Sequence, residues 1–345
     1  MPCRNTIARA TNFFERQTQP LVNTDKIQSI FTALAVGDAV GMPTEFMTRL
    51  EIQNRFRAFV PGLVDTKLSR HHADLPFASV TDDTEQNLYL YRLYLVSKRV
   101  DAKETASCLL RWAEETGAEQ KRYIGPSSLS ALNAIRAGTP VEEAGRYGTT
   151  CGGIMRTPSA VLYRKHTTDD DLARDILACL LCTHNTSEAL ESAGAYGFGL
   201  RAALDGGSRK EILAEAIRGA NRLIALAPEI NCAPSSAVRV KAMYSLAATH
   251  SPEHLLDTLY NLYGTGLPSA DVCGAVFAIF FSAREDVWKA IRMGASIGGD
   301  TDTIASLAGA LCCAFAGGHN IPDAIVGSVF SNNAILRGAP WEASI

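Results

Sequence analysis

Several features that would place a chain in a simple class are missing from these 345 residues. No apolar run approaches the roughly 18 residues that a membrane-spanning helix needs. Acidic and basic residues are mixed without a long block of either sign, and the formal net charge is only -3. A charge balance of this kind gives no electrostatic basis for general nucleic-acid binding. We therefore expect a protein with neither a membrane span nor a nucleic-acid partner.

Two further absences bear on fold and compartment. No convincing series of alternating apolar and polar residues is present, although strands that are buried on one face need one. The N-terminus lacks the apolar segment of a secretory signal. The nine cysteines are odd in number, and most lie in apolar helical context, as buried thiols do in a reducing compartment. We expect a cytoplasmic protein without structural disulfides.

One cysteine pair, Cys179 and Cys182, has the spacing of a zinc or redox motif. No second pair completes a tetrahedral site, and His184 follows too closely in sequence to do so. The same spacing is typical of one face of a packed helix. We favour core thiols over metal ligands here.

Helical periodicity dominates the chain. Residues 1–25 are polar and precede any strong pattern, so they predict an N-terminal arm. Residues 26–345 predict one all-α domain, in which residues 47–80 are an irregular loop with solvated His71 and His72. The expected helices begin at Lys26, run again after Gln86, and then lie near 102–116, 127–137, 152–164, 170–183, 186–204, 209–227, 236–248, 252–262, 270–282, 285–297, 303–316 and 322–335.

Three acidic clusters stand at expected helix ends. They are Glu45, the turn Thr81-Asp82-Asp83, and the turn Asp300-Thr301-Asp302-Thr303, which follows Gly298-Gly299. Side chains two residues apart point about 200° away from each other in a helix but the same way in extended backbone. We therefore expect Asp300 and Asp302 in a turn that enters a helix. The alternative is that the clusters are independent helix N-caps.

Charge counting favours a shared metal site if the clusters meet. Asp and Thr oxygens are hard ligands that suit Mg²⁺, Mn²⁺ or Ca²⁺. The five carboxylates would carry a charge of about -5, and burying that charge is costly unless it is compensated. Two divalent ions nearly balance it, and a dinuclear centre is a known hydrolytic arrangement.

These motifs resemble the ADP-ribosylglycohydrolases, the relatives of dinitrogenase reductase-activating glycohydrolase and of the ADP-ribosylarginine hydrolases. The resemblance covers about residues 26–335. It rests on Gly37-Asp38-Ala39-Val40-Gly41 with Glu45, on Thr81-Asp82-Asp83-Thr84-Glu85 and on Gly298-Gly299-Asp300-Thr301-Asp302-Thr303. Weaker matches are Gly125-Pro126-Ser127-Ser128 and Gly152-Gly153-Ile154-Met155-Arg156.

The resemblance implies an all-α orthogonal multi-helix bundle with two Mg²⁺ or Mn²⁺ ions. Thr81, Asp82 and Asp83 would hold one ion, Asp300 and Thr303 the other, and Asp302 would bridge them. Glu45 and Asp302 would be catalytic. Glu45 would lie beside the distal ribose, where it could orient water, act as general base or contact the sugar.

The resemblance also implies a ligand-binding loop. Cys151, Gly152, Gly153 and Met155 would cradle the diphosphate, and Arg156 is either part of that pattern or a surface residue. Cys151 departs from the polar residue usual in the family, although its backbone N–H could still serve phosphate. His184 would contact ADP-ribose or cap a helix. Tyr260, Tyr263 and the loop 264–268 would wall the adenosine side.

The implied activity is metal-dependent removal of ADP-ribose from modified protein side chains, most plausibly arginine. Serine-linked or free ADP-ribose derivatives are the alternative substrates. A different class is an immunity protein that blocks an ADP-ribosyltransferase toxin with residues 1–25, for which a disordered tail is the plain alternative. A catalytically inactive structural relative is a third class, and retention of all five carboxylates argues against it.

Overall fold

The computed structural model describes residues 23–228 and 230–338, which form helices joined by turns. The only pairing of β type among these residues is an isolated bridge between Thr150 and Pro268. The expected all-α fold is therefore confirmed. Most of the expected arm, residues 1–22, lies outside the described residues. No described helix combines the length and the apolarity that crossing a bilayer requires.

Two helices lie at the centre of the fold: α1 (Thr24–Gly41) and α16 (Thr301–Ala316). Every residue of α1 from Ile30 to Gly41 is buried, as is every residue of α16 from Thr301 to Ala314. Small residues allow the two backbones to touch. A Cβ on Gly37 would lie 2.6 Å from the carbonyl oxygen of Ala305. This contact brings the end of α1 to the start of α16.

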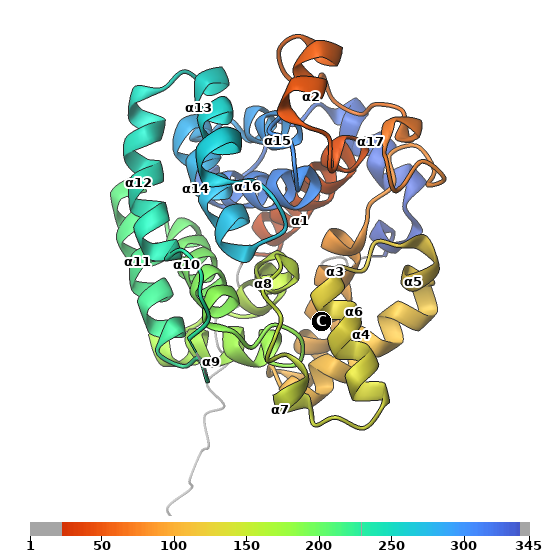
Figure 1. Ribbon diagram of the computed structural model, residues 1–345, viewed down its shortest axis with the longest axis vertical. Helices are drawn as coiled ribbons and strands as arrows, with labels where there is room; N and C mark the ends of the chain where they lie inside the picture. The colour runs from red at the N-terminus through yellow and green to blue at the C-terminus, as the bar shows by residue number, and fades with distance from the viewer. Residues whose placement is uncertain (1–22, 229, 339–345) are drawn as a thin grey trace, which may run out of the picture.

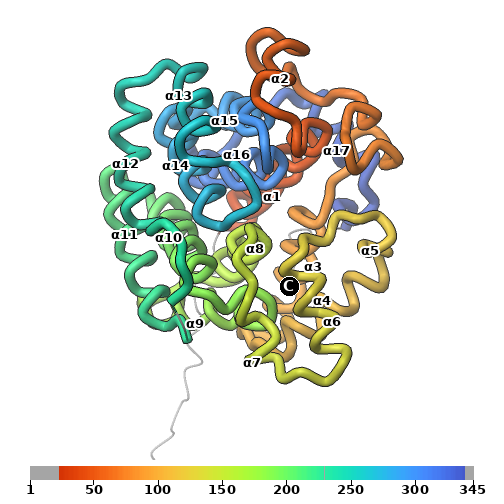
Figure 2. The backbone as a smooth tube through the Cα atoms, in the orientation of Figure 1, coloured from red at the N-terminus to blue at the C-terminus, as the bar shows by residue number. Residues whose placement is uncertain are grey.

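The remaining helices cover this pair on two sides (Figures 1 and 2). On one side lie α10 (Ser187–Leu204), α11 (Arg209–Ile224), α12 (Ser236–Thr249), α13 (Pro252–Thr258), α14 (Ser269–Ala283) and α15 (Val287–Ser296). On the other lie α3 (Asp82–Ser97), α4 (Ala102–Thr116), α5 (Ala118–Lys121), α6 (Pro126–Arg136) and α17 (Asp323–Asn332). Between and below them are α7 (Val141–Ala144), α8 (Gly152–Leu162) and α9 (Asp169–Leu180).

Local sequence sets most helix ends. Asp101, Thr168, Thr186 and Ser208 each accept a hydrogen bond from a backbone N–H in the first turn of the helix that follows. Such caps satisfy N–H groups that have no partner within the helix. At the other end, Gly317 closes α16 in a left-handed conformation.

The stretch 47–80 is less irregular than its sequence indicates. It contains α2 (Arg49–Phe56), which begins with a capping box formed by Thr48 and Glu51, and the short 3-10 turn Thr66–Leu68. Two other 3-10 turns, Met42–Thr44 and Ala334–Leu336, extend α1 and follow α17. The helix expected over 252–262 ends at Thr258 and continues as a π-helical turn, Leu259–Tyr263.

The cysteine prediction is confirmed for the described residues. Cys179 and Cys182 are free, fully buried thiols. Burial raises the pKa of the Cys182 thiol to about 11, so it stays protonated at neutral pH.

Candidate functional site

The turn that enters α16 is clamped between two distant segments. Gly298 and Gly299 both have φ of +84°, a conformation that favours glycine. The N–H of Gly299 donates to the carbonyl of Met47 at 3.0 Å, and the N–H of Asp300 donates to the carbonyl of Thr265 at 2.8 Å. A Cβ on Gly299 would lie only 2.1 Å from that same Thr265 oxygen. The paired glycines therefore fix where Asp300 lies.

Three carboxylates converge beside this turn. One oxygen from each of Glu45, Asp300 and Asp302 lies within 4.8 Å of the other two, and all three residues are buried. Glu45 comes from the segment after α1, whereas the two aspartates flank the first residue of α16. Asp300 is the N-cap residue of α16, but its side chain makes no capping bond. The prediction of independent caps is therefore wrong at this helix.

The second acidic turn joins the same cluster. The Thr303 hydroxyl donates to Oδ2 of Asp83 at 3.2 Å. Asp83 is buried in the first turn of α3, and the neighbouring Asp82 is half-buried. The charge of Asp300 acts on both Asp82 and Asp83. The structure thus brings together all three acidic segments that the sequence singles out.

Asp38 is a site residue to which sequence reasoning assigned no role. Its carboxylate accepts four hydrogen bonds, from the N–H and hydroxyl of Thr81 (both 2.9 Å) and from the N–H and hydroxyl of Thr84 (3.1 and 2.5 Å). Thr81 makes no capping bond of its own, so α3 is capped by a residue of α1. The signal available in the sequence was an aspartate amid the apolar residues of α1, because a carboxylate on a buried helix needs polar partners.

Burial and mutual repulsion raise the pKa of these carboxyls. Burial raises the pKa of Asp38 and of Asp300 to about 6, although hydrogen bonds partly oppose the shift. The pKa values of Asp82, Asp83 and Asp302 lie well above the usual range, first through burial and then through the charges of neighbouring carboxylates. A cluster of this kind needs protons or cations to remain buried.

The donor set fits divalent cations. Oε2 of Glu45, Oδ1 of Asp83 and Oδ2 of Asp300 are buried without a hydrogen-bond partner. Unpaired buried carboxylate oxygens are rare because each carries a desolvation penalty. The hydroxyls of Thr81 and Thr303 donate to Asp38 and Asp83, so their oxygen lone pairs remain available. Hard oxygen ligands of this type suit Mg²⁺ or Mn²⁺.

The expected ligand loop lies on the α8 side of the cluster. Cys151 is the N-cap of α8, and its sulfur lies 3.9 Å from the Thr303 hydroxyl. The N–H of Cys151 donates to the carbonyl of Leu267 at 2.8 Å. The expectation that this N–H is available to phosphate is therefore wrong in this conformation. The N–H groups of Gly152, Gly153 and the next residue lie in the first turn of α8. The N–H groups of a first turn have no partner within the helix, so these are the ones that suit an anion.

His184 packs against that loop through Thr150 and Gly152. The ring is fully buried, with Nε2 3.1 Å from the Thr150 hydroxyl and Nδ1 2.8 Å from the Thr183 hydroxyl. Burial, and then the charge of Arg156, lowers the pKa of His184 well below its usual value. A Cβ on Gly152 would lie 2.8 Å from the ring, so the glycine allows this packing. A direct contact between His184 and a ligand would require these bonds to be exchanged.

Met155 and Arg156 are both buried, so the alternative of a surface arginine is wrong. The carbonyl of Met155 accepts a hydrogen bond from Asn87 at 2.8 Å. The Arg156 guanidinium donates to the carbonyls of Gly152 and Cys179 and to the Thr183 hydroxyl. These contacts position the loop and do not present charged groups at the surface.

His72 was expected to be solvated but is buried, unlike the exposed His71. Nε2 of His72 lies 3.0 Å from Oε2 of Glu45. The two groups are at ion-pair distance, although their geometry is not that of an aligned hydrogen bond. No periodicity marks His72 in the sequence, because its burial depends on the path of the loop.

The loop 264–268 is tied to the cluster. Thr265 is buried, and its hydroxyl donates to the carbonyl of Gly298 at 2.7 Å. Tyr260 packs near Gly298, because a Cβ on that glycine would lie 3.0 Å from its ring. Tyr260 and Tyr263 are both half-buried. Their expected stacking with adenosine stays a prediction.

Comparison with known proteins agrees with this arrangement. YegU of Escherichia coli (strain K12), described as uncharacterized, is 28% identical over 311 residues, which are 88% of this chain and 91% of that protein. ADP-ribosylarginine hydrolase Tri1 of Pseudomonas putida (strain GB-1) is 26% identical over 305 residues, 86% of this chain and 72% of that protein.

Structural comparison gives the same fold. A solved structure described as an ADP-ribosylglycohydrolase-related protein complex superposes with a TM-score of 0.63 at 23% identity and covers 91% of this chain and 99% of that chain. The family model described as ADP-ribosylglycohydrolase matches residues 19–339, from before α1 to beyond α17. With a match over nearly its whole length, the chain belongs to the ADP-ribosylglycohydrolase family.

Proposed function

We propose that this protein is a metal-dependent hydrolase that removes ADP-ribose from modified protein side chains, with arginine as the preferred linkage. Family membership supports hydrolysis of the ADP-ribosyl glycosidic bond. The observation that carries the metal-dependent part is the pair of buried carboxylate oxygens without partners on Asp83 and Asp300, beside the converging carboxylates of Glu45 and Asp302. Divalent cations held there would supply Lewis-acid polarisation and orientation for water and the ribose hydroxyls.

The chain's own residues divide the work of holding that centre. Asp82, Asp83 and Thr81 face it from α3, and Asp300, Asp302 and Thr303 face it from α16. Asp38 holds the α3 side by accepting the Thr81 N–H and hydroxyl at 2.9 Å. We assign Asp302 the bridging position between the two groups; burial raises its pKa, and the charges of Glu45, Asp300 and Asp83 then raise it further.

Glu45 is the group that we assign to the reacting water. It is the one carboxylate of the three-residue cluster that lies outside α16 and its cap, and its Oε2 lies 3.0 Å from Nε2 of His72. In that position Glu45 can hold the water or accept its proton while the glycosidic bond breaks. The water oxygen bonds to the anomeric carbon as the bond from that carbon to the arginine nitrogen breaks, and the proton taken from the water balances the one gained by the released guanidine, which leaves as a guanidinium.

The diphosphate is assigned to the start of α8. Helix N-termini bind anions because their first N–H groups are unpaired and the helix dipole is positive there. Gly152 and Gly153 are the first two residues of this helix, and both are packed closely against the side chain of His184. Cys151 then lies between this anion site and the carboxylates, with its sulfur 3.9 Å from Thr303.

Arginine linkage is supported by two relatives called ADP-ribosylarginine hydrolase Tri1, from Pseudomonas putida at 26% identity and Serratia proteamaculans at 23%. The experiment compares arginine-linked with serine-linked ADP-ribosyl peptides, with Mg²⁺ and after removal of metal by a chelator. Released ADP-ribose is measured. We expect metal-dependent release from the arginine-linked peptide. Release only from the serine-linked peptide would reassign the linkage, and no release from either with Mg²⁺ or Mn²⁺ would overturn the proposal.

A further inference from the structure

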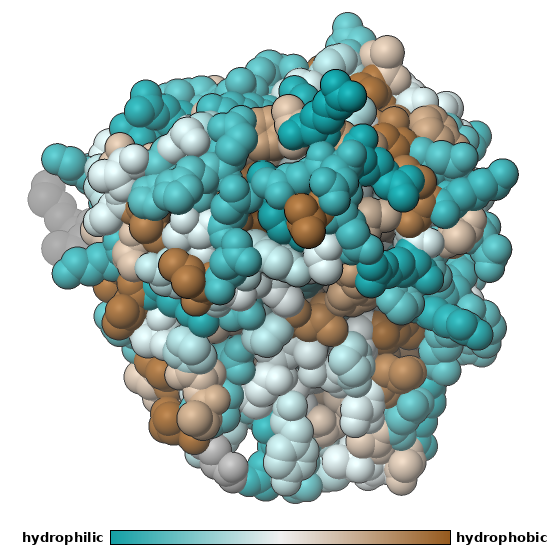
Figure 3. All heavy atoms as spheres, turned by 45° about the horizontal axis from the view of Figure 1, so that its top comes forward, coloured by the Kyte–Doolittle hydropathy of each residue, from teal (hydrophilic) through white to brown (hydrophobic). Residues whose placement is uncertain are grey.

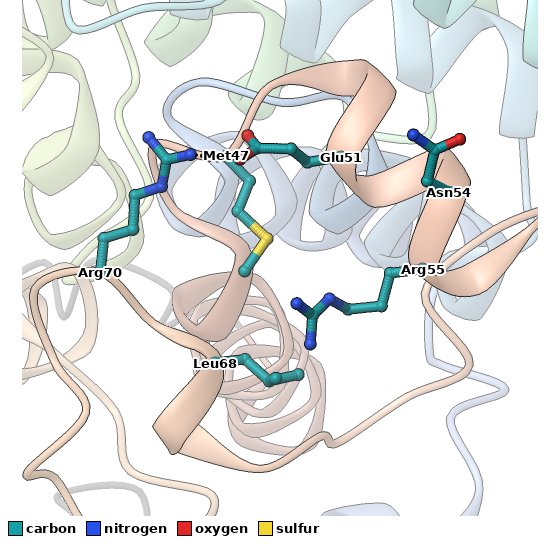
Figure 4. A pocket seen from close by; sticks show the side chains of 6 residues that line it. All are labelled: Met47, Glu51, Asn54, Arg55, Leu68 and Arg70. Carbon is teal, nitrogen blue, oxygen red and sulfur yellow. Dashed lines mark hydrogen bonds and ion pairs between the residues drawn. The ribbon is translucent and has the colours of Figure 1, made fainter.

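A pocket of about 490 Å³ opens between α2 and the loop that follows it (Figure 4). Its walls combine an apolar part, Met47 and Leu68, with polar and charged side chains. The latter are Glu51, Asn54, Arg55 and Arg70. In Figure 4 the Arg55 guanidinium points into the pocket from α2, and Arg70 borders it from the loop.

The pocket is lined by residues that stand close in sequence to Glu45 and His72. Met47 lies two residues after Glu45, and its carbonyl accepts the N–H of Gly299 at 3.0 Å. Arg70 lies two residues before His72, whose ring approaches Glu45. The same two segments therefore place Glu45 and His72 at the cluster and Met47 and Arg70 at the pocket.

The charges that line the pocket indicate which kind of ligand it suits. The Glu51 carboxylate is already used, because it accepts the N–H and hydroxyl of Thr48 and pairs with Arg70. Arg55 has no carboxylate partner among the described residues that line the pocket. Two guanidinium groups against one carboxylate leave the pocket with net positive charge. It therefore suits an anionic group, and guanidinium is well matched to a carboxylate.

The pocket lies on the Glu45 side of the centre, whereas the anion site at α8 lies on the Cys151 side. In Figure 1, α2 is at the top and α8 is below α16. With the diphosphate at α8, the part of the substrate on the opposite side of Glu45 is the modified side chain and the polypeptide that carries it. Figure 3 brings this end of the molecule forward and shows hydrophobic residues in separate small groups among hydrophilic ones. Recognition here rests on charge more than on a large apolar surface.

We propose that this pocket binds the polypeptide that carries the ADP-ribosylated residue and selects an acidic residue close to it in sequence. Met47 and Leu68 give the peptide an apolar contact, the Asn54 amide can bond its backbone, and the unpaired Arg55 receives the carboxylate. The inference rests on the proposed hydrolase function, whose substrate class it names.

The test uses ratios measured within one enzyme. Two arginine-linked ADP-ribosyl peptides differ only in Glu or Gln at positions near the modified arginine. For the unmodified protein we expect kcat/KM to be about 5-fold higher for the Glu peptides, the scale of an exposed ion pair. Arg55→Glu should reverse this preference, and Arg55→Gln should bring the ratio close to one.

Arg57→Glu is the matched control. Arg57 ends the same helix, is exposed and does not line the pocket, so this variant should keep the preference. A ratio of one in the unmodified protein, or a preference that survives in Arg55→Glu, would overturn the inference. Hydrolysis of the small compound ADP-ribosyl-arginine distinguishes failure of the pocket proposal from failure of the proposed function. If ADP-ribosyl-arginine is cleaved but the Glu and Gln peptides react equally fast, only the pocket proposal fails. If neither it nor the peptides are cleaved, the proposed function fails and the pocket proposal falls with it.

Discussion

Gly41 and Asp302 lie in backbone contact, although 260 positions separate them in the sequence. A Cβ on Gly41 would lie 2.5 Å from the Cα of Asp302 and 2.5 Å from the carbonyl oxygen of Thr301. The glycine at the end of α1 therefore sets how closely the first turn of α16 approaches Glu45. The distance between carboxylates in the candidate centre depends on a residue that has no side chain.

Gly41→Ala should consequently damage the site without changing any ligand. Because the new methyl group meets backbone atoms that cannot rotate away, we expect a loss of about 3 kcal/mol in the free energy of unfolding. We also expect weaker Mn²⁺ binding. Urea unfolding and calorimetric titration measure the two effects. Gly327→Ala is the control, because that exposed glycine in α17 has no atom within 4 Å of its Cβ position, and the change should stabilise the protein slightly.

Asp38→Ala should destabilise the protein through α3. The change leaves two backbone N–H groups and two hydroxyls buried without their acceptor. We expect a loss of about 2–4 kcal/mol in the free energy of unfolding, and a smaller loss for Asp38→Asn, which keeps one acceptor oxygen. Asp25→Ala, in the exposed first turn of α1, is the control. A loss in Asp38→Ala no larger than in that control would contradict the capping role.

The metal-free protein should lose stability as pH rises. The pKa values of Asp38 and Asp300 are raised from 3.8 to about 6. Between these values the folded state binds more protons than the unfolded state, so the free energy of unfolding falls with increasing pH. The contribution of these two groups to the free energy of unfolding is greatest below about pH 4 and is lost as the pH rises through about 6. Thermal unfolding in a chelator, followed from pH 4.5 to 7.5, measures this trend.

Divalent cations should remove much of that dependence, since they replace the bound protons. A metal-free protein whose unfolding temperature rises from pH 5 to 7 would contradict the electrostatic description. Buffer-dependent heats in calorimetric titration provide a second measurement, because binding should release protons near pH 6.

Asp302→Asn should abolish metal-dependent hydrolysis. The substitution keeps the size of the side chain but removes a charge from the centre, so we expect Mn²⁺ affinity to fall at least about 10-fold. Asp323→Asn, at the exposed start of α17, is the control. Released ADP-ribose and calorimetric titration are the two readouts. Full activity in Asp302→Asn would sink the dinuclear proposal.

His72→Ala should lower turnover by misplacing Glu45. The 3.0 Å approach between Nε2 and Oε2 is lost, and small misplacements of a reacting group cost roughly 10- to 100-fold in rate. His72→Gln retains a donor and should recover part of kcat. His71→Ala, on the same loop but exposed, should behave as the unmodified protein. Equal activity in all three variants would show that Glu45 needs no support from the loop.

Much of the fold could be predicted from the sequence because helical periodicity is local. The expected helix over 209–227 is observed as Arg209–Ile224, and the capping box of Ser208 and Glu211 fixes its start. The missed helix α2 shows the limit. Few of its residues are apolar, and only Arg49 and Ile52 are buried, so the helix shows no apolar periodicity in the sequence. The capping box of Thr48 and Glu51 was the one feature that could have predicted it.

The sequence by itself determined which residues are candidates for the chemistry, since the acid and glycine motifs are contiguous stretches of chain. Tertiary structure decided how these residues are used. It made Asp38 the cap of a distant helix, buried His72 against Glu45, and gave the Cys151 N–H to Leu267. The physical reason is that hydrogen-bond partners and burial depend on which backbones meet, and the packing of small residues between α1 and α16 sets that meeting across almost the whole length of the chain.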